Sequence, residues 1–273
     1  MTERRITSRQ NERVKQVARL RDARDRARQH RFVIDGTREI ARALTAGVEI
    51  VEVFLCDDLL ATAAARELAC QLEAACPAVW RVDAPVFEKL AFGARHEGIV
   101  AVARAPALSL AALTLPADPL IAVLVGVEKP GNVGAVLRSA DGAGVSAVIV
   151  ADGGTDLFNP NTIRASLGTV FTLPIAVATA AETLTWLRER GISVYASRPD
   201  ASSPYHLADF SAASAVVLGS EAQGLGPLWQ APEVRGLKLP MHGVADSLNV
   251  SATAAVLFYE ARRQRDEHPP RQT

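Results

Sequence analysis

The stretch LPMHGVADSLNVS at residues 239–251 decides how we interpret this chain. It joins a short apolar run, GLKL at residues 236–239, to an apolar helical pattern. Polar residues at the start of a helix can cap its free N–H groups, and they can also face a ligand. One such residue is enough for a cap, whereas here both Ser247 and Asn249 flank Leu248. The surplus of polar side chains therefore indicates a binding site.

Two further polar segments that contain glycine lie upstream. They are EKPGNVGAVLR at residues 128–138 and LGSEAQGLG at residues 218–226. Each follows or ends an apolar run that predicts a strand, and sheets of parallel strands bind ligands at the carboxyl ends of those strands. The glycines allow close approach of the backbone to a ligand, but the spacing fits neither a dinucleotide loop nor an NTP loop. Together the three segments favour one shared site.

Arg138 interrupts the apolar helical pattern of the first segment. A guanidinium placed on an apolar helix face is costly unless it pairs with an anion, so we expect Arg138 to be paired or to bind a phosphate or another anion. Taken alone, the segment is explained equally well as a strand-to-helix turn that needs glycine, with Asn132 as the cap.

Apolar runs that predict strands alternate with longer helical patterns along the chain. We expect a basic helical arm and a small α/β domain over residues 1–106, and a linker rich in Ala, Pro and Leu over 107–117. A second α/β domain is expected over residues 118–264, followed by a tail over 265–273. Strands that alternate with helices imply a mostly parallel sheet with helices on both faces.

The periodicity also predicts the individual elements. The expected strands are residues 32–34, 50–55, 79–82, 99–103, 120–125, 147–151, 193–196, 215–218 and 237–239. The expected helices are residues 8–30, 36–46, 61–75, 85–92, 133–143, 163–167, 180–190 and 248–263. In the first helix, Val14, Val17 and Leu20 share one stripe and predict its buried face.

Charge is unevenly distributed along the chain. The formal net charge is zero, but residues 1–42 carry 13 Arg or Lys against six Asp or Glu, a local net charge of +7. A basic arm suits a polyanionic partner. Arginine stems that cover apolar surface, with their charges solvated, explain the composition equally well.

Cysteine and histidine usage argues against a metal site. Cys56, Cys70 and Cys76 form no CxxC pair, and the five histidines lack metal-ligand spacing, so we expect no metal and a reducing compartment. The sequence has no apolar segment that predicts a signal peptide or a membrane span. We therefore expect a cytoplasmic protein with no membrane partner.

Taken together, the three segments resemble the three motifs of the SpoU–TrmH family of RNA 2′-O-ribose methyltransferases, in the SPOUT superfamily. The order and spacing of the motifs at 128–138, 218–225 and 239–251 agree, and the resemblance covers about residues 118–264. Residues 31–40, RFVIDGTREI, are more weakly similar to the start of the small ribosomal-protein-like substrate-binding domain that often precedes the catalytic domain. The combination is specific, although each motif alone is not.

The resemblance implies a fold, a cofactor and an assembly. The catalytic domain is expected to be a homodimeric α/β fold whose C-terminal segment forms a trefoil knot, which general rules of chain connectivity disfavour. S-adenosyl-L-methionine is the expected cofactor, held in a bent conformation by the backbone of the second and third motifs.

The same resemblance assigns the site residues. The residues expected around the cofactor are Leu218, Gly219, Leu239, Met241 and Leu248. The residues expected to line the reacting region are Asn132, Arg138, Glu221, Ser247 and Asn249. A guanidinium stays protonated in proteins and is a poor proton acceptor, so we expect Arg138 to clamp an RNA phosphate and stabilise the developing alkoxide. A phosphate or a water molecule would then take the proton.

The implied activity is 2′-O-ribose methylation of structured RNA. Ribosomal RNA, in particular 23S rRNA, is the expected partner because relatives with the N-terminal domain mainly modify ribosomal RNA, and phosphate contacts dominate RNA affinity. A tRNA substrate and a non-catalytic RNA-binding module of the same fold are the alternatives. Housekeeping modification and antibiotic self-resistance are both compatible with the sequence.

One residue departs from the family pattern. The first motif often carries aspartate before its proline, and here that position is Lys129. If the position contacts RNA or the dimer partner, we expect Lys129 to alter substrate choice without impairing catalysis.

Overall fold

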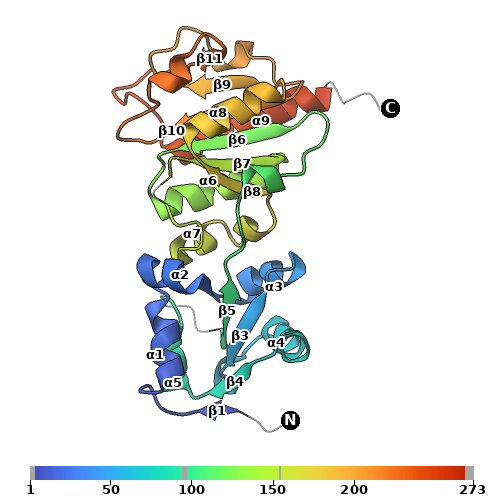
Figure 1. Ribbon diagram of the computed structural model, residues 1–273, viewed down its shortest axis with the longest axis vertical. Coiled ribbons are helices and arrows are strands. Elements are labelled where there is room, and N and C mark those ends of the chain that lie inside the picture. The colour runs from blue at the N-terminus through green and yellow to red at the C-terminus, as the bar shows by residue number, and fades with distance from the viewer. Residues whose placement is uncertain (1–3, 94–96, 154, 268–273) are drawn as a thin grey trace. The chain divides into compact units, whose positions relative to one another are not determined.

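The computed structural model describes residues 4–93, 97–153 and 155–267, and the chain divides into two compact units (Figure 1). Unit 1 comprises Met1–Ala107 and Asp156–Thr172, and unit 2 comprises Leu108–Thr155 and Leu173–Thr273. Residues 156–172 lie inside the range expected for the second α/β domain, yet they pack with the N-terminal part of the chain.

Unit 1 is built on a mixed five-stranded sheet of order β1-β4-β3-β5-β2. Its strands are β1 (Arg5–Ile6), β2 (Arg31–Asp35), β3 (Ile50–Leu55), β4 (Val79–Val82) and β5 (Ile99–Arg104). Its helices are α1 (Glu12–Arg19), α2 (Ala23–Gln29), α3 (Thr37–Thr45), α4 (Ala63–Ala75), α5 (Ala84–Leu90) and α7 (Pro160–Ala165). Strand β5 runs antiparallel to β2 and β3, and the other pairs are parallel.

The prediction of a single helix at residues 8–30 is wrong, because the structure has two helices there, α1 and α2. The Asp22 side chain accepts a hydrogen bond from the backbone N–H of Arg24 and caps the start of α2. A capping aspartate satisfies a free N–H group and so favours a new helix at that point. Val14, Val17 and Leu20 are buried in the core of unit 1, as their spacing predicts.

Among the residues that the structure describes, seven of the 13 basic residues in the arm form ion pairs within unit 1. The pairs are Arg5–Asp83, Arg9–Glu88, Arg13–Glu52, Lys15–Glu12, Arg26–Asp156, Arg28–Asp25 and Arg31–Glu52. Residues 1–107 as a whole carry 18 Arg or Lys against 15 Asp or Glu, a net charge of +3. The excess positive charge of the arm is therefore partly balanced by acidic residues of unit 1. Attraction of RNA by the arm stays a prediction.

Residues 156–172 are held to the rest of unit 1 by a buried ion pair and by stacked rings. The Asp35 side chain, which is 5% exposed, accepts hydrogen bonds from Arg164 at 3.0 Å and 2.7 Å. The backbone N–H of Phe92 donates to the same carboxylate at 2.7 Å. The rings of Phe32 and Phe158 stack with their centroids 4.3 Å apart. A segment from much later in the chain thus completes the N-terminal unit.

We expect Arg164→Ala to lower the free energy of unfolding by about 3 kcal/mol, because the buried Asp35 carboxylate loses the guanidinium that pairs with both its oxygens. Urea-induced unfolding followed by circular dichroism measures the loss. The matched control is Arg188→Ala, which removes an exposed ion pair with Glu233 and should cost less than about 1 kcal/mol. Equal stabilities of the two variants would contradict this role of the buried pair.

Unit 2 contains a six-stranded sheet of order β11-β9-β10-β6-β7-β8, in which every pair of neighbours is parallel. Its strands are β6 (Leu120–Val125), β7 (Ala147–Ala151), β8 (Ile175–Ala178), β9 (Ser193–Ser197), β10 (Ser214–Gly219) and β11 (Val234–Leu237). Its helices are α6 (Pro130–Ala143), α8 (Ala180–Glu189) and α9 (Val250–Glu267). The α/β fold class with a largely parallel sheet is confirmed.

Helices cover both faces of this sheet. Leu184 and Leu187 of α8 pack with Ile121 and Val123 of β6 in one apolar core. Helix α9 lies on the opposite side of the sheet and packs along α6 (Figure 1). Because α6 and α9 begin after β6 and β11, both helices start near the edge where the strands end.

Two strands of unit 2 differ from the expected pattern by more than single residues at their ends. Strand β8 was not expected, and β11 covers Val234–Leu237 rather than residues 237–239. Strand β11 pairs with β9 as far as Leu237, which lies opposite Ser197 at the end of β9, and Lys238 forms only an isolated bridge to Pro204. Among the residues that the structure describes, no helix combines the length and apolar character needed to cross a membrane.

Candidate active site

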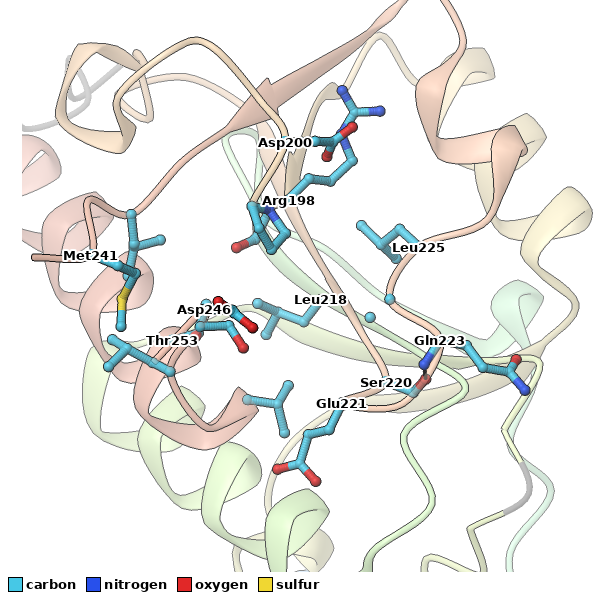
Figure 2. A pocket seen from close by; sticks show the side chains of 18 of the residues that line it. Arg198, Asp200, Leu218, Ser220, Glu221, Gln223, Leu225, Met241, Asp246 and Thr253 are labelled. Atoms are coloured by element: carbon cyan, nitrogen blue, oxygen red, sulfur yellow. Dashed lines mark hydrogen bonds and ion pairs between the residues drawn. The ribbon is translucent and has the colours of Figure 1, made fainter. Parts of the chain in front are cut away.

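A pocket of about 420 Å³ lies in unit 2, at the carboxyl ends of β9 and β10 (Figure 2). The walls come from the ends of these two strands and from the segments that follow β10 and β11. All five residues expected around the cofactor line the pocket: Leu218, Gly219, Leu239, Met241 and Leu248. Of the residues expected at the reacting region, Glu221 and Ser247 also line it.

The backbone of β10 ends in close contact with the loop that follows it. A Cβ atom on Gly219 would lie 2.5 Å from the backbone carbonyl carbon and oxygen of Gly224. Only glycine fits this approach, because the obstructing atoms belong to the backbone and cannot rotate away. The glycine at position 219 therefore has a packing cause.

The carboxylate of Glu221 joins the three polar segments. The side-chain amides of Asn132 and Asn249 donate to its Oε1 at 2.9 Å and 2.7 Å. The Lys129 ammonium donates to Oε2 at 2.6 Å. Lys129 and Asn132 belong to the first segment, Glu221 to the second and Asn249 to the third, so the fold brings together side chains far apart in the sequence.

These contacts keep Glu221 ionised. The hydrogen bond from Lys129 is the main cause that lowers the pKa of Glu221, and the amide of Asn132 adds to it. A carboxyl group with a lowered pKa is charged at neutral pH and loses its charge only as the pH falls through that lowered value. Glu221 is therefore a poor proton acceptor at neutral pH and a good anchor for hydrogen-bond donors.

Asn249 has two functions in the structure. Its Oδ1 accepts hydrogen bonds from the backbone N–H of Ser251 at 2.9 Å and from the hydroxyl of Ser251 at 2.6 Å, at the start of α9. Its Nδ2 donates to Glu221 on the other side. The helix cap and the link to the site are thus made by one side chain.

Arg138 lies away from this network. It is exposed on α6, almost two helical turns beyond Asn132, and it does not line the pocket. Within the residues that the structure describes, its guanidinium makes no hydrogen bond or ion pair. The face of α6 that carries Arg138 points to solvent, so the guanidinium carries no desolvation cost there, and binding of a phosphate or another anion by Arg138 stays a prediction.

The sequence patterns missed the segment Ser197–Asp200, which lines the pocket after β9. Figure 2 shows Arg198 and Asp200 at the end of the pocket opposite Glu221. The signal was available, since residues that follow a parallel strand lie at the same edge as the other segments. Asp246 also lines the pocket, as do Asp200 and Glu221, and these last two pair with Arg198 at 3.6 Å and with Lys129 at 2.6 Å.

Comparisons with known proteins extend this picture. Residues 119–259 match the SpoU rRNA Methylase family, and residues 11–101 match the MRM3-like substrate binding domain. The chain is 28% identical over 260 residues to the 23S rRNA (guanosine(2553)-2′-O)-methyltransferase RlmP of Bacillus subtilis strain 168. The aligned region covers 94% of this chain and 98% of RlmP.

Solved structures show the same similarity over the whole chain. A crystal structure of an RNA 2′-O ribose methyltransferase has 42% identity and a TM-score of 0.82, and covers 96% of this chain and 99% of its own. The crystal structure of the SpoU methyltransferase AviRb from Streptomyces viridochromogenes, in complex with the cofactor AdoMet, has 26% identity and a TM-score of 0.85. The match covers 94% of this chain and 99% of AviRb. The family match at residues 119–259 spans more than half of the sequence. The chain therefore belongs to the SpoU rRNA methylase family.

Proposed function

We propose that this protein transfers a methyl group from S-adenosyl-L-methionine to the 2′-hydroxyl of a ribose in structured RNA, with 23S rRNA as the substrate. The observation that carries the proposal is the convergence of three separate segments beside one pocket, joined by the hydrogen bonds of Glu221. The similarity to RlmP supports the RNA substrate, and the similarity to AviRb supports the cofactor.

The pocket residues fit S-adenosyl-L-methionine. A volume of about 420 Å³ lies within the range of small-molecule sites. Leu218, Leu239 and Leu248 offer apolar surface for the adenosyl group, and the bare backbone of Gly219 permits close approach. The carboxylate of Asp246, which also lines the pocket, would favour the positive sulfonium. When bound, the cofactor supplies an activated methyl group.

The protein's own side chains would orient the ribose and balance charge. Asn132 and Asn249, held by the ionised Glu221, would fix the sugar beside the pocket. Orienting the ribose hydroxyl in this way would supply a large part of the acceleration, because it turns a bimolecular encounter into a step between groups already in place. Arg138 would clamp an RNA phosphate and stabilise the developing alkoxide, while a phosphate or a water molecule takes the proton.

The proposal includes a homodimer and the C-terminal trefoil knot. Arg138 does not line the pocket of its own chain, so a second copy is the simplest source of an arginine at the reacting region. Val256 and Tyr259 are 37% and 54% exposed on α9 and would be covered by such a partner. A cytoplasmic location, where ribosomal RNA is modified, belongs to the same proposal.

The test is methyl transfer from labelled S-adenosyl-L-methionine to 23S rRNA, followed by digestion to nucleosides. We expect the label in a ribose-methylated nucleoside, since the motifs are those of 2′-O-methyltransferases. Total tRNA serves as the comparison substrate. Label on a base, or label in tRNA and none in rRNA, would contradict the proposal.

A further inference from the structure

Lys129 occupies an unusual position beside the pocket. It is the residue before Pro130 at the start of α6, and its side chain is 73% exposed. Its ammonium lies 2.6 Å from Oε2 of Glu221, which lines the pocket, whereas Lys129 itself does not line it. The cation therefore lies on the outer side of a carboxylate that faces the candidate reacting region.

The contact between Lys129 and Glu221 can open at small cost. Ion pairs between exposed side chains contribute little to stability because water solvates both partners well. The Oε1 atom of Glu221 would keep its two hydrogen bonds from Asn132 and Asn249 if the ammonium left Oε2. Lys129 is thus free to exchange Glu221 for a stronger anion while the rest of the network stays in place.

RNA chemistry supplies that anion at the required place. The 2′-hydroxyl and the 3′-phosphate are carried by adjacent carbons of one ribose. A nucleotide whose 2′-hydroxyl reaches the methyl group must therefore bring its 3′-phosphate to the mouth of the pocket. An ammonium binds phosphate as a point charge without a fixed geometry, which suits an exposed and flexible side chain.

We propose that Lys129 binds an RNA backbone phosphate beside the target nucleotide, and that its ammonium moves from Glu221 to this phosphate when RNA enters. The inference rests on the proposed function. Lys129 then contributes to RNA affinity and to the position of the ribose, but not to cofactor binding. Glu221 remains anchored by Asn132 and Asn249 in the complex with RNA.

The experiment measures binding of a 23S rRNA fragment at several salt concentrations by wild-type protein and by Lys129→Gln. Loss of one phosphate contact should lower the slope of log affinity against log salt by about one, because one fewer counterion is released. We expect RNA affinity at low salt to fall about 3- to 10-fold, with the affinity for S-adenosyl-L-methionine unchanged and the salt slope restored in Lys129→Arg. The matched control is Arg188→Gln, which opens the exposed ion pair with Glu233 and should keep the wild-type slope.

A second measurement separates phosphate binding from an effect through Glu221. In the Glu221→Gln background, Lys129→Gln should still lower the salt slope, because the phosphate contact does not depend on the carboxylate. A wild-type slope in Lys129→Gln, or a change that vanishes in the Glu221→Gln background, would overturn the inference. Failure of the wild-type protein to bind or methylate any rRNA would instead reject the proposed function.

Discussion

Replacing Arg138 by alanine is expected to lower the rate of RNA methylation at saturating cofactor by at least about 100-fold, because removal of a donor that stabilises a developing oxyanion typically has this effect. Arg138 is the one basic residue of α6, and it is exposed. Its loss should leave the core of unit 2 and the cofactor pocket unchanged, since Arg138 does not line that pocket. Single-turnover transfer to rRNA measures the rate, and calorimetric titration measures cofactor affinity.

Two controls make the Arg138 result specific. Arg138→Lys keeps the positive charge but loses the bidentate geometry, and it should recover only part of the rate. Arg188→Ala removes an exposed arginine of the same unit and should keep the wild-type rate. Undiminished turnover by Arg138→Ala, or a parallel loss of cofactor affinity, would contradict the assigned role.

Replacing Gly219 by alanine is expected to weaken binding of S-adenosyl-L-methionine by at least about 100-fold. The added Cβ would lie 2.5 Å from the backbone of Gly224, so the loop that forms one wall of the pocket must move. Misplacement of about 1 Å in a preorganised site is enough for losses of this size. Isothermal titration with the cofactor measures the effect, and circular dichroism checks that the fold is retained.

The same loop offers a matched control for Gly219. A Cβ on Gly226 would have no heavy atom within 4 Å, and the φ of Gly226 is −67°, which any residue adopts. Gly226→Ala should therefore bind the cofactor as the wild-type protein does. Equal cofactor affinity in Gly219→Ala and Gly226→Ala would show that the close approach of the backbone is not required.

Most strands of both sheets could be predicted from the sequence, because each is a short apolar run between turn residues. Four of them, β3, β4, β6 and β7, have the expected bounds. The break between α1 and α2 was missed although the apolar stripe ends at Leu20, because the polar residues 23–29 are also compatible with a continuing helix and only the cap at Asp22 marks the new start. Local patterns could not assign residues 156–172 to unit 1, since the Asp35–Arg164 pair joins positions far apart in the sequence.

The site could be predicted in outline but not in its electrostatics. Strand ends and family motifs together indicated the residues beside the pocket, including Glu221 and Asn249. No pattern along the chain could show that Lys129 pairs with Glu221, because this contact depends on how two loops meet in space. The exposure of Arg138 could not be predicted from the sequence either, since an arginine in an apolar helical pattern can face the core or the solvent.

Nucleoside mass spectrometry of 23S rRNA from cells with and without the gene tests whether this chain methylates one ribose of that RNA. We expect one 2′-O-methylated nucleotide to be missing without the gene. The wild-type protein should restore this methyl group on the isolated rRNA, and Arg138→Ala should not. An identical set of ribose methyl groups in the two rRNA samples would contradict the claim.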